Sequence, residues 1–333
     1  MFNLTNLEIN RFRTKIVFFC FIMFIFFAGF YVHSFKNNLN SDCDFSKYEY
    51  INKEMKCDSR LVIKKTGYEE FKRNLLEVIE ENKTINNIND VSIYFRDLQN
   101  GPTLGIQEHE LFTPASLLKV PLLMTYFNLR DSVPDLFDRE LFFQKSNKFV
   151  SQNITPGKSI KLNNAYTINS LLEYMIKYSD NQAYFILFNY LYKISPNTDL
   201  LKETLVDLGV LYPKSFIEET LSVKSYSSIF VQLFHSSYFN KKETSEEILS
   251  LLTDVDWKNG LNAGVPEDIK ISHKFGERNM EGMKQLHDCG IIYFPENPYL
   301  LCIMTRGNDF QKLSSFIGLV SKMFYEEIDS RKL

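Results

Sequence analysis

A serine and a lysine three residues apart are the first pair in this sequence that can do chemistry together. Ser116 and Lys119 lie in the stretch 112–121, Phe-Thr-Pro-Ala-Ser-Leu-Leu-Lys-Val-Pro, which is typical of a loop running into a buried helix. Helical side chains three apart share a face, so the Lys119 ammonium group can meet the Ser116 hydroxyl group. A serine needs a neighbouring base to act as a nucleophile, and a helix N-terminus favours the negative charge that develops on attack. The structural alternative is that Ser116 caps a core helix and Lys119 extends to solvent.

A second polar group, Ser179-Asp180-Asn181, falls between two apolar helical stretches. We expect it to form a short loop over buried structure. The Ser179 hydroxyl group can relay a proton there, and the Asn181 amide can bind a substrate amide as well as the Lys119 ammonium group. The same residue types are also common in turns and at helix N-caps, which is the alternative.

The third signal is His273-Lys274-Phe275-Gly276-Glu277, where an apolar strand ends in a cation and then a glycine. A lysine there can receive a substrate carboxylate, and a glycine lets the backbone approach a ligand closely. A lysine on a strand can equally be a solvated group that protects the edge of a sheet.

The elements that must position these residues are two groups of strands separated by a run of helices. Apolar periodicity predicts strands at 91–96, 103–107, 269–275, 285–294 and 299–306. It predicts helices at 68–80, directly after Ser116, and at 166–178, 181–192, 198–208, 226–235, 243–252 and 309–327. No strand is expected between residues 131 and 255. Tight turns join antiparallel strands, so we expect an α/β fold of the α+β type: a five-stranded antiparallel sheet covered by the N- and C-terminal helices, plus an all-helical lobe.

The three polar groups together form the set Ser-x-x-Lys, Ser-Asp-Asn and Lys-x-Gly, in the order that marks penicillin-recognising serine enzymes. Each falls in the context that the set requires: a helix start, a loop between helices and a sheet edge. The sequence therefore resembles the class A β-lactamase family, in its broad sense, over about residues 65–324. Phe-Thr-Pro-Ala before Ser116, Tyr178 before the second group and Gln182-Ala183 after it also agree. The resemblance implies a β-lactamase/transpeptidase-like fold.

The resemblance also implies catalytic roles for three side chains. Ser116 would be the acylated nucleophile, Lys119 its base partner, and Ser179 the group that passes a proton to the leaving nitrogen.

Substrate binding would fall to four further residues. Asn181 would hold the substrate's side-chain amide, and Lys274 would attract its carboxylate. Gly276 would admit the substrate close to the strand. The backbone N–H groups of Ser116 and Glu277 would form the oxyanion hole.

Two departures from the family pattern bear on the reaction. Phe275 stands where the family has threonine or serine, so a hydroxyl group is replaced by a bulky ring. The loop at 210–223 is shorter than the family's and lacks the pattern that carries its deacylating glutamate. Glu218 and Glu219 are the only carboxylates in that loop; either is a candidate for deacylation, and the alternative is a solvated turn.

The N-terminal region predicts a membrane anchor. Residues 16–32 are uncharged and mostly apolar, and Arg11, Arg13 and Lys15 precede them. A positive flank belongs on the cytoplasmic side, so the rest of the chain is expected outside the cytoplasm, in the periplasm or the exterior. No small-residue cleavage site follows, which favours an uncleaved single-pass anchor over a cleaved signal peptide.

We therefore expect a tail and anchor in residues 1–35 (the anchor at about 16–34), a linker in 36–65 and a serine hydrolase domain in 66–333. Cys43 and Cys57 flank a polar stretch of the linker and can pair in an oxidising compartment. Cys289 and Cys302 are expected to be core cysteines, with Cys302 opposite Gly290.

Composition excludes some classes of function. The chain has 333 residues, 44% hydrophobic residues and a net charge of -3. This balance excludes a disordered chain and gives no basic surface for nucleic acid. No Cys/His grouping has metal-ligand spacing, so we expect no metal and no cofactor.

We expect a membrane-anchored, monomeric serine hydrolase that opens a β-lactam or a related amide through an acyl-Ser116 intermediate. One alternative is a peptidoglycan D,D-peptidase-like or other amide hydrolase with slow deacylation. Another is a binding or scaffold module that keeps the fold without catalysis.

Overall fold

The computed structural model describes residue 23 and residues 48–52, 67–99, 101–144, 152–154, 157–210 and 220–331. Contacts divide the chain into a unit of Met1–Lys47 and Lys53–Arg60 and a unit of Tyr48–Asn52 and Leu61–Leu333. The fold described below is that of the second unit, which carries every candidate site residue.

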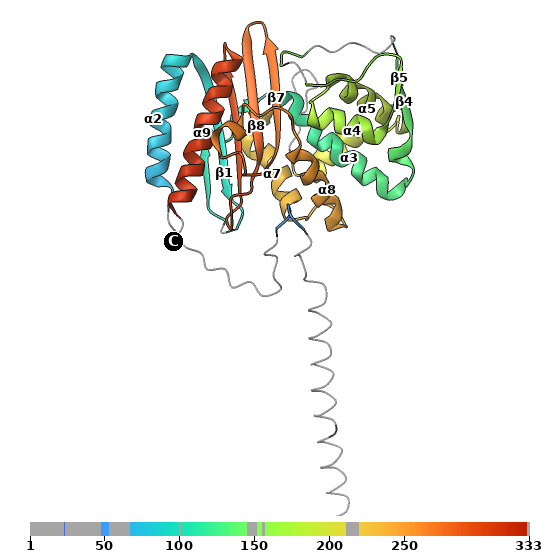
Figure 1. Cartoon of the computed structure of the whole chain (residues 1–333), viewed down its shortest axis with the longest axis horizontal. Helices are drawn as coiled ribbons and strands as arrows, with labels where there is room; N and C mark the ends of the chain where they lie inside the picture. Colours follow the sequence, from blue (N-terminus) through green and yellow to red (C-terminus); the bar gives the residue numbers. More distant parts are fainter. Residues whose placement is uncertain are drawn as a thin grey trace, which may run out of the picture. The chain divides into compact units, whose positions relative to one another are not determined.

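Five antiparallel strands form the main sheet, in the order β2-β1-β9-β8-β7, which confirms the predicted sheet. The first two strands of the domain and the last three meet in this one sheet, where β1 pairs with β9 (Figure 1). Strand β7 is left as an edge strand. The bounds of the five strands are β1 Ile88–Asp97, β2 Thr103–Ile106, β7 Ile271–Met280, β8 Met283–Ile292 and β9 Tyr299–Gly307.

The hairpin of β7 and β8 is longer than predicted. Its turn residues Glu281 and Gly282 have φ angles of 51° and 93°, and two successive positive φ angles are typical of a type I′ hairpin turn. The predicted strand stops at residue 275 because the residues from Glu277 onward are half-buried or exposed and mostly polar. The extension makes Glu277 and Arg278 part of a hydrogen-bonded strand instead of a loop.

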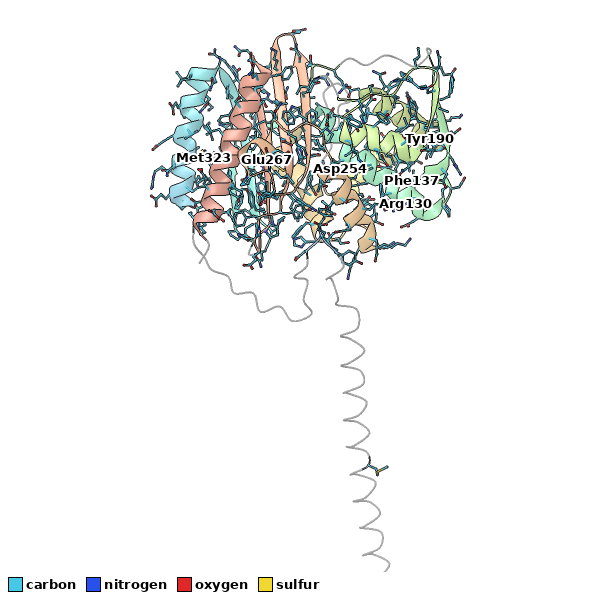
Figure 2. The ribbon with its side chains drawn as sticks, in the orientation of Figure 1. Arg130, Phe137, Tyr190, Asp254, Glu267 and Met323 are labelled. Atoms are coloured by element: carbon cyan, nitrogen blue, oxygen red, sulfur yellow. A yellow bond between two sulfur atoms is a disulfide. The ribbon has the colours of Figure 1, made fainter. Side chains whose placement is uncertain are left out.

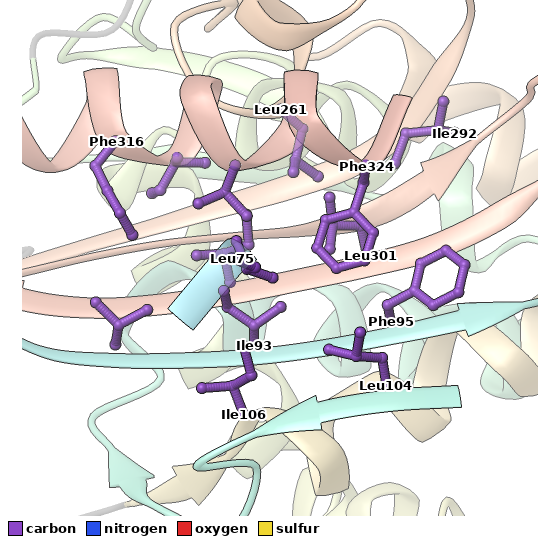
Figure 3. Packing of buried hydrophobic residues seen from close by; sticks show 14 of the residues in the cluster. Leu75, Ile93, Phe95, Leu104, Ile106, Leu261, Ile292, Leu301, Phe316 and Phe324 are labelled. Atoms are coloured by element: carbon purple, nitrogen blue, oxygen red, sulfur yellow. The ribbon is translucent and has the colours of Figure 1, made fainter. Parts of the chain in front are cut away.

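Helices α2 (Glu69–Asn86) and α9 (Phe310–Ser330) lie side by side on one face of the sheet (Figure 1). In α2 the buried residues recur every four positions, as an amphipathic helix requires. Figure 3 shows the core between these helices and the sheet, where the ring of Phe95 on β1 stacks on that of Phe324 with centroids 5.0 Å apart. This core fixes the sheet on which Lys274 and Gly276 are carried.

Helices α3, α4, α5, α6 and η2 form the second lobe. Helix α7 packs against β1 and β9, α8 packs against β7, and η3 packs against α9. In this lobe Arg130 and Phe137, both labelled in Figure 2, are in cation–π contact, with Arg130 Cζ 4.9 Å from the centre of the Phe137 ring. The bounds are η1 Ala115–Leu118, α3 Lys119–Ser132, η2 Leu136–Asp138, α4 Ile168–Lys177, α5 Asn181–Ile194, α6 Leu200–Asp207, α7 Val223–Phe234, α8 Lys242–Thr253 and η3 Leu261–Gly264.

Three short strands, β4 (Glu140–Phe143), β5 (Asn164–Thr167) and β6 (Leu221–Ser222), correct the prediction that residues 131–255 contain no strand, and a fourth, β3 (Leu111–Phe112), precedes that region. Strand β4 pairs with β5, and β3 pairs with β6. Strands of two to four residues are too short to show a period-2 pattern. In β4 the three apolar residues are consecutive and only Phe143 is buried, so the pattern does not separate an inner from an outer face.

The prediction for the two strand cysteines was wrong by one residue of register. Cys289 pairs directly with Cys302 across β8 and β9, and the two form a disulfide, while Gly290 pairs with Leu301. A shift of one residue moves every side chain of a strand to the other face. The tip of the hairpin between these strands has six residues, which left the register open to this error.

A short segment within the predicted linker is docked on the domain. The Glu246 carboxylate accepts hydrogen bonds from the backbone N–H groups of Tyr50 (2.8 Å) and Ile51 (3.0 Å), and Glu49 N–H also donates to it. Tyr48, Tyr50 and Ile51 are buried. The segment 48–52 therefore belongs structurally to the domain predicted at 66–333.

Among the residues that the structure describes, no helix has both the length and the apolarity that a membrane span needs. The predicted anchor at about 16–34 lies outside those residues except for Met23, and so do Cys43 and Cys57.

Candidate active site

Ser116 lies in the short 3-10 helix η1, which runs directly into α3 at Lys119. Its neighbour Ala115 has a φ of 50°, a left-handed conformation that costs a residue with a side chain of order 1 kcal/mol. The turn is held from two sides. His287 on β8 contacts the Thr113 carbonyl oxygen at 3.0 Å, and the Tyr226 hydroxyl group of α7 donates to the Leu117 carbonyl oxygen at 2.9 Å. The half-buried Ser116 is therefore presented on a strained and well-anchored turn.

Lys119 lies one turn further on and is buried, with 2% of its surface exposed. Its Nζ lies 2.5 Å from the Ser179 carbonyl oxygen, 3.1 Å from Ser179 Oγ and 2.7 Å from Asn181 Oδ1. Burial lowers the pKa of Lys119 to about 7, although the negative charges of Asp180 and Glu277 act in the opposite direction. A large fraction of this amine is therefore neutral near pH 7 and able to accept a proton.

The Ser179-Asp180-Asn181 group acts both as a helix N-cap and as a set of polar contacts to Lys119. Asp180 is the N-cap of α5 and is fully buried, and its carboxylate accepts from the Gln182 N–H at 2.7 Å and from the Ile160 N–H at 2.8 Å. Ser179 has a φ of 53°. The cap fixes the loop, so that the residues on both sides of Asp180 turn their polar atoms to Lys119.

Lys274 reaches the same hydroxyl group from the sheet. Its Nζ lies 2.9 Å from Ser179 Oγ and 2.9 Å from the Phe275 carbonyl oxygen. Burial and the positive charge of Lys119 lower the pKa of Lys274 well below its usual value. Two lysines thus approach one serine oxygen.

Phe275 closes off Lys274. The Lys274 ammonium group lies 4.0 Å from the centre of the Phe275 ring. The Trp257 ring packs against the same Phe275 ring, with the two ring centres 4.5 Å apart. Lys274 is 0% exposed, so its ammonium group is not open to a substrate carboxylate in this arrangement. The bulky ring noted in the sequence therefore covers the cation that it follows.

Gly276 allows β7 to pass close to the Ser116 turn. A Cβ atom at this position would lie 2.8 Å from the Pro114 carbonyl oxygen and 3.1 Å from Leu117 Cγ. Any larger residue would push the strand away from η1. Ser116 and Glu277 consequently line one cleft, as an oxyanion hole made from their two N–H groups requires.

This cleft has a volume of about 510 Å³ and lies between η1, α5 and the end of β7. It contains the serine, its lysine and the asparagine of the loop, together with aromatic and charged residues. Its lining residues are Thr113, Ala115, Ser116, Leu118, Lys119, Asn153, Asn181, Tyr184, Phe185, Glu277, Arg278 and Asn279.

Gln152 and Asn153 belong to the site but carry no sequence signal. The Gln152 side chain donates to the Ser179 carbonyl oxygen at 2.9 Å and accepts from the Asn181 N–H at 3.2 Å. The Asn153 N–H donates to the Glu277 carboxylate at 2.8 Å, and its side-chain amide also donates there. These two residues join the Ser179 loop to β7 across the cleft. They follow no motif or periodic pattern, so only the fold identifies them.

The candidate deacylation carboxylates Glu218 and Glu219 lie outside the described residues. Glu277 is the only carboxylate among the described residues that line the cleft. Its carboxylate already accepts a hydrogen bond from the Asn153 N–H group. In the described part of the chain, no cluster of three or more His, Cys, Asp and Glu side chains is arranged to hold a metal ion.

Comparison with known proteins gives the family of the chain. A family model described as the β-lactamase enzyme family matches residues 70–328. No curated protein matches the chain significantly in sequence.

Solved structures share the fold at low sequence identity. PBP-A is 20% identical with a TM-score of 0.64, and the match covers 77% of this chain and 96% of PBP-A. A β-lactamase from Chitinophaga pinensis is 18% identical with a TM-score of 0.65, covering 77% of this chain and 99% of that one. The extended-spectrum β-lactamase TLA-1 is 16% identical with a TM-score of 0.67, covering 79% and 99%.

Proposed function

This chain belongs to the β-lactamase enzyme family, and from that premise we propose that it is a serine hydrolase that opens a β-lactam or a related amide through an acyl-Ser116 intermediate. The observation that carries the proposal is the environment of Lys119. A buried amine with a pKa of about 7, bonded to Ser179 and Asn181, lines the same cleft as Ser116.

Acylation begins with proton transfer from Ser116 Oγ to the neutral amine of Lys119. Three acceptors surround Lys119 Nζ, which suits the ammonium form. The neutral amine keeps two N–H bonds and gains a lone pair. The serine oxygen attacks the amide carbonyl carbon, and the developing oxyanion accepts hydrogen bonds from the N–H groups of Ser116 and Glu277.

Collapse of the tetrahedral intermediate breaks the C–N bond, and the leaving nitrogen takes a proton from Ser179 Oγ. Ser179 accepts hydrogen bonds from both Lys119 and Lys274, which use its two oxygen lone pairs. Its own proton is then directed away from the lysines. The Lys119 ammonium group returns a proton to Ser179, which restores the balance of protons.

Slow release of the acyl group is the second part of the proposal. Glu277 is the only described carboxylate in the cleft, and it is bound by Asn153. A water molecule in the cleft therefore has no open carboxylate to act as its base among the described lining residues. PBP-A, which shares the fold, has been solved in a variant form as an acyl-enzyme complex with penicillin G. This supports the alternative of a peptidoglycan-peptidase-like amide hydrolase with a long-lived intermediate.

We further propose that the domain is monomeric and held at the membrane, outside the cytoplasm, by the segment at about 16–34. The apolar run behind Arg11, Arg13 and Lys15 supports this orientation. The Cys289–Cys302 disulfide also supports it, because disulfides persist in oxidising compartments.

Labelling of the full-length chain in detergent tests the proposal. We expect a fluorescent penicillin to label the wild type but not Ser116→Ala, and a chromogenic cephalosporin to be turned over slowly after one equivalent has reacted. Fast turnover would support an efficient β-lactamase. Absence of label from the folded wild type would leave the catalytically silent binding module as the better account.

A further inference from the structure

Arg278 lies on the face of β7 that looks toward the nucleophile. Side chains two residues apart on a strand share a face, and Lys274, Gly276 and Arg278 form such a series. Lys274 reaches Ser179, and Gly276 packs on the Ser116 turn. Arg278 accordingly lines the cleft that contains Ser116.

The position of Arg278 along β7 assigns it to one side of the scissile bond. Lys274 contacts Ser179, which is the proposed proton donor to the leaving nitrogen. The part of β7 around Lys274 therefore lies beside the leaving group of the substrate. Gly276 and Glu277 are level with Ser116. Arg278 comes after them, about 13 Å beyond Lys274 at about 3.3 Å per residue, and therefore lies on the acyl side.

The other charges of the cleft are already engaged. Lys119 and Lys274 are buried and bound to Ser179, and the Glu277 carboxylate accepts hydrogen bonds from Asn153. Arg278 is exposed, and no carboxylate of a described residue forms an ion pair with it. Its guanidinium group is thus the open cation of the described cleft.

We infer that Arg278 binds an anionic group on the acyl side of the substrate, so that the preferred substrates carry a carboxylate there. This inference rests on the proposed acylation of Ser116. A guanidinium group can bind a carboxylate through two parallel hydrogen bonds. Tyr184 and Phe185 on α5 line the same cleft and give the rest of the acyl group an apolar surface.

A matched pair of penicillins isolates this interaction. Benzylpenicillin and its α-carboxy derivative share the ring system and differ by one carboxylate on the acyl side chain. Acylation rate constants for both are measured by intact mass on the full-length chain, with wild type, Arg278→Gln and Arg278→Lys. Arg73→Gln serves as the control, because Arg73 is an exposed arginine on α2, far from the described cleft lining.

We expect the ratio of the carboxy to the neutral rate constant to fall about 10-fold in Arg278→Gln, with the neutral rate kept. Arg278→Lys should lose less, and raising the salt concentration should lower the wild-type ratio, since an exposed ion pair is screened. An unchanged ratio in Arg278→Gln, with both compounds still acylating Ser116, would overturn the inference and leave the proposed function standing. Absence of acylation of the wild type by either compound would overturn both.

Discussion

The ammonium group of Lys274 lies 2.9 Å from the hydroxyl oxygen of Ser179 and has no exposed surface. Phe275 covers it with its ring, 4.0 Å from Nζ to the ring centre. Lys274 therefore acts through Ser179 in this arrangement, as a positioning residue, and not as an open binding site for a carboxylate.

The first prediction concerns the coupling of these two residues. Lys274→Gln and Ser179→Ala should each slow the acylation of Ser116 by about 10²-fold, as expected for the loss of a proton-transfer group. The double variant should be no more than a few-fold slower than either single variant, because both changes remove the same function. A double-mutant cycle on the acylation rate constant measures this, with the exposed Lys258→Gln as the control. If the double variant loses the product of the two single-variant rate losses, Lys274 contacts the substrate independently of Ser179.

The second prediction is the pH dependence of acylation. Burial lowers the pKa of Lys119 to about 7, and the neutral amine is the base. The acylation rate constant should therefore rise with pH through about 7 and level off above it, whereas an ordinary lysine would give a rise near pH 10. Rates measured from pH 5 to pH 9 test this. Lys119→Arg should remove the rise, since a guanidinium group stays protonated, and a rise retained in that variant would exclude Lys119 as the base.

The third prediction concerns Phe275. Phe275→Thr should expose Lys274 and supply a hydroxyl group beside it. The ratio of the acylation rate constant for a β-lactam acid to that for its methyl ester should therefore rise about 10-fold in this variant. It should also lower the free energy of unfolding by about 3 kcal/mol, because the ring is buried against Trp257.

Phe275→Leu is the matched control, since it removes the ring without adding a hydroxyl group. If both variants change the acid-to-ester ratio equally, the hydroxyl group has no part in binding the carboxylate.

The fourth prediction concerns the docked segment 48–52. Glu246→Gln should lower the free energy of unfolding by about 1–3 kcal/mol, because its carboxylate accepts backbone hydrogen bonds from Tyr50 and Ile51. Urea unfolding of the full-length chain measures this. Glu247→Gln, one residue on, should cost at most about 1 kcal/mol, because Glu247 forms a surface ion pair with Arg130. Equal losses in the two variants would show that the hydrogen bonds from segment 48–52 to Glu246 add no more stability than a surface ion pair.

The sequence predicted the parts of the fold that have a strong period. The buried face of α2 repeats every four residues, β9 begins with the apolar run 299–304, and β1 contains the shorter run 93–95. The end of β7 was missed because its residues are exposed on an edge strand and only their hydrogen bonds to β8 define them. The pairing of Cys289 with Cys302 was missed for a related reason, since the hydrophobic pattern alone did not determine which residues of two mostly buried strands face each other.

The site was predictable where motifs carry it and hidden where the fold assembles it. The types and order of Ser116, Lys119, Ser179 and Lys274 were sufficient to propose a reaction. The contact of Gln152 with the Ser179 loop joins residues 27 positions apart and follows from no local pattern. The burial of Lys274 also required the structure, because the sequence places a ring beside the cation but does not say which group covers the other.

Acylation of Ser116 can be followed by a time course of intact mass after the full-length chain is mixed with benzylpenicillin. The proposed acyl-enzyme predicts a shift by one penicillin mass that maps to the peptide containing Ser116, persists well beyond the time of its formation and is absent from Ser116→Ala. A folded wild-type chain that gains no adduct and leaves the penicillin intact would contradict the acylation of Ser116, as would an adduct that also forms on Ser116→Ala.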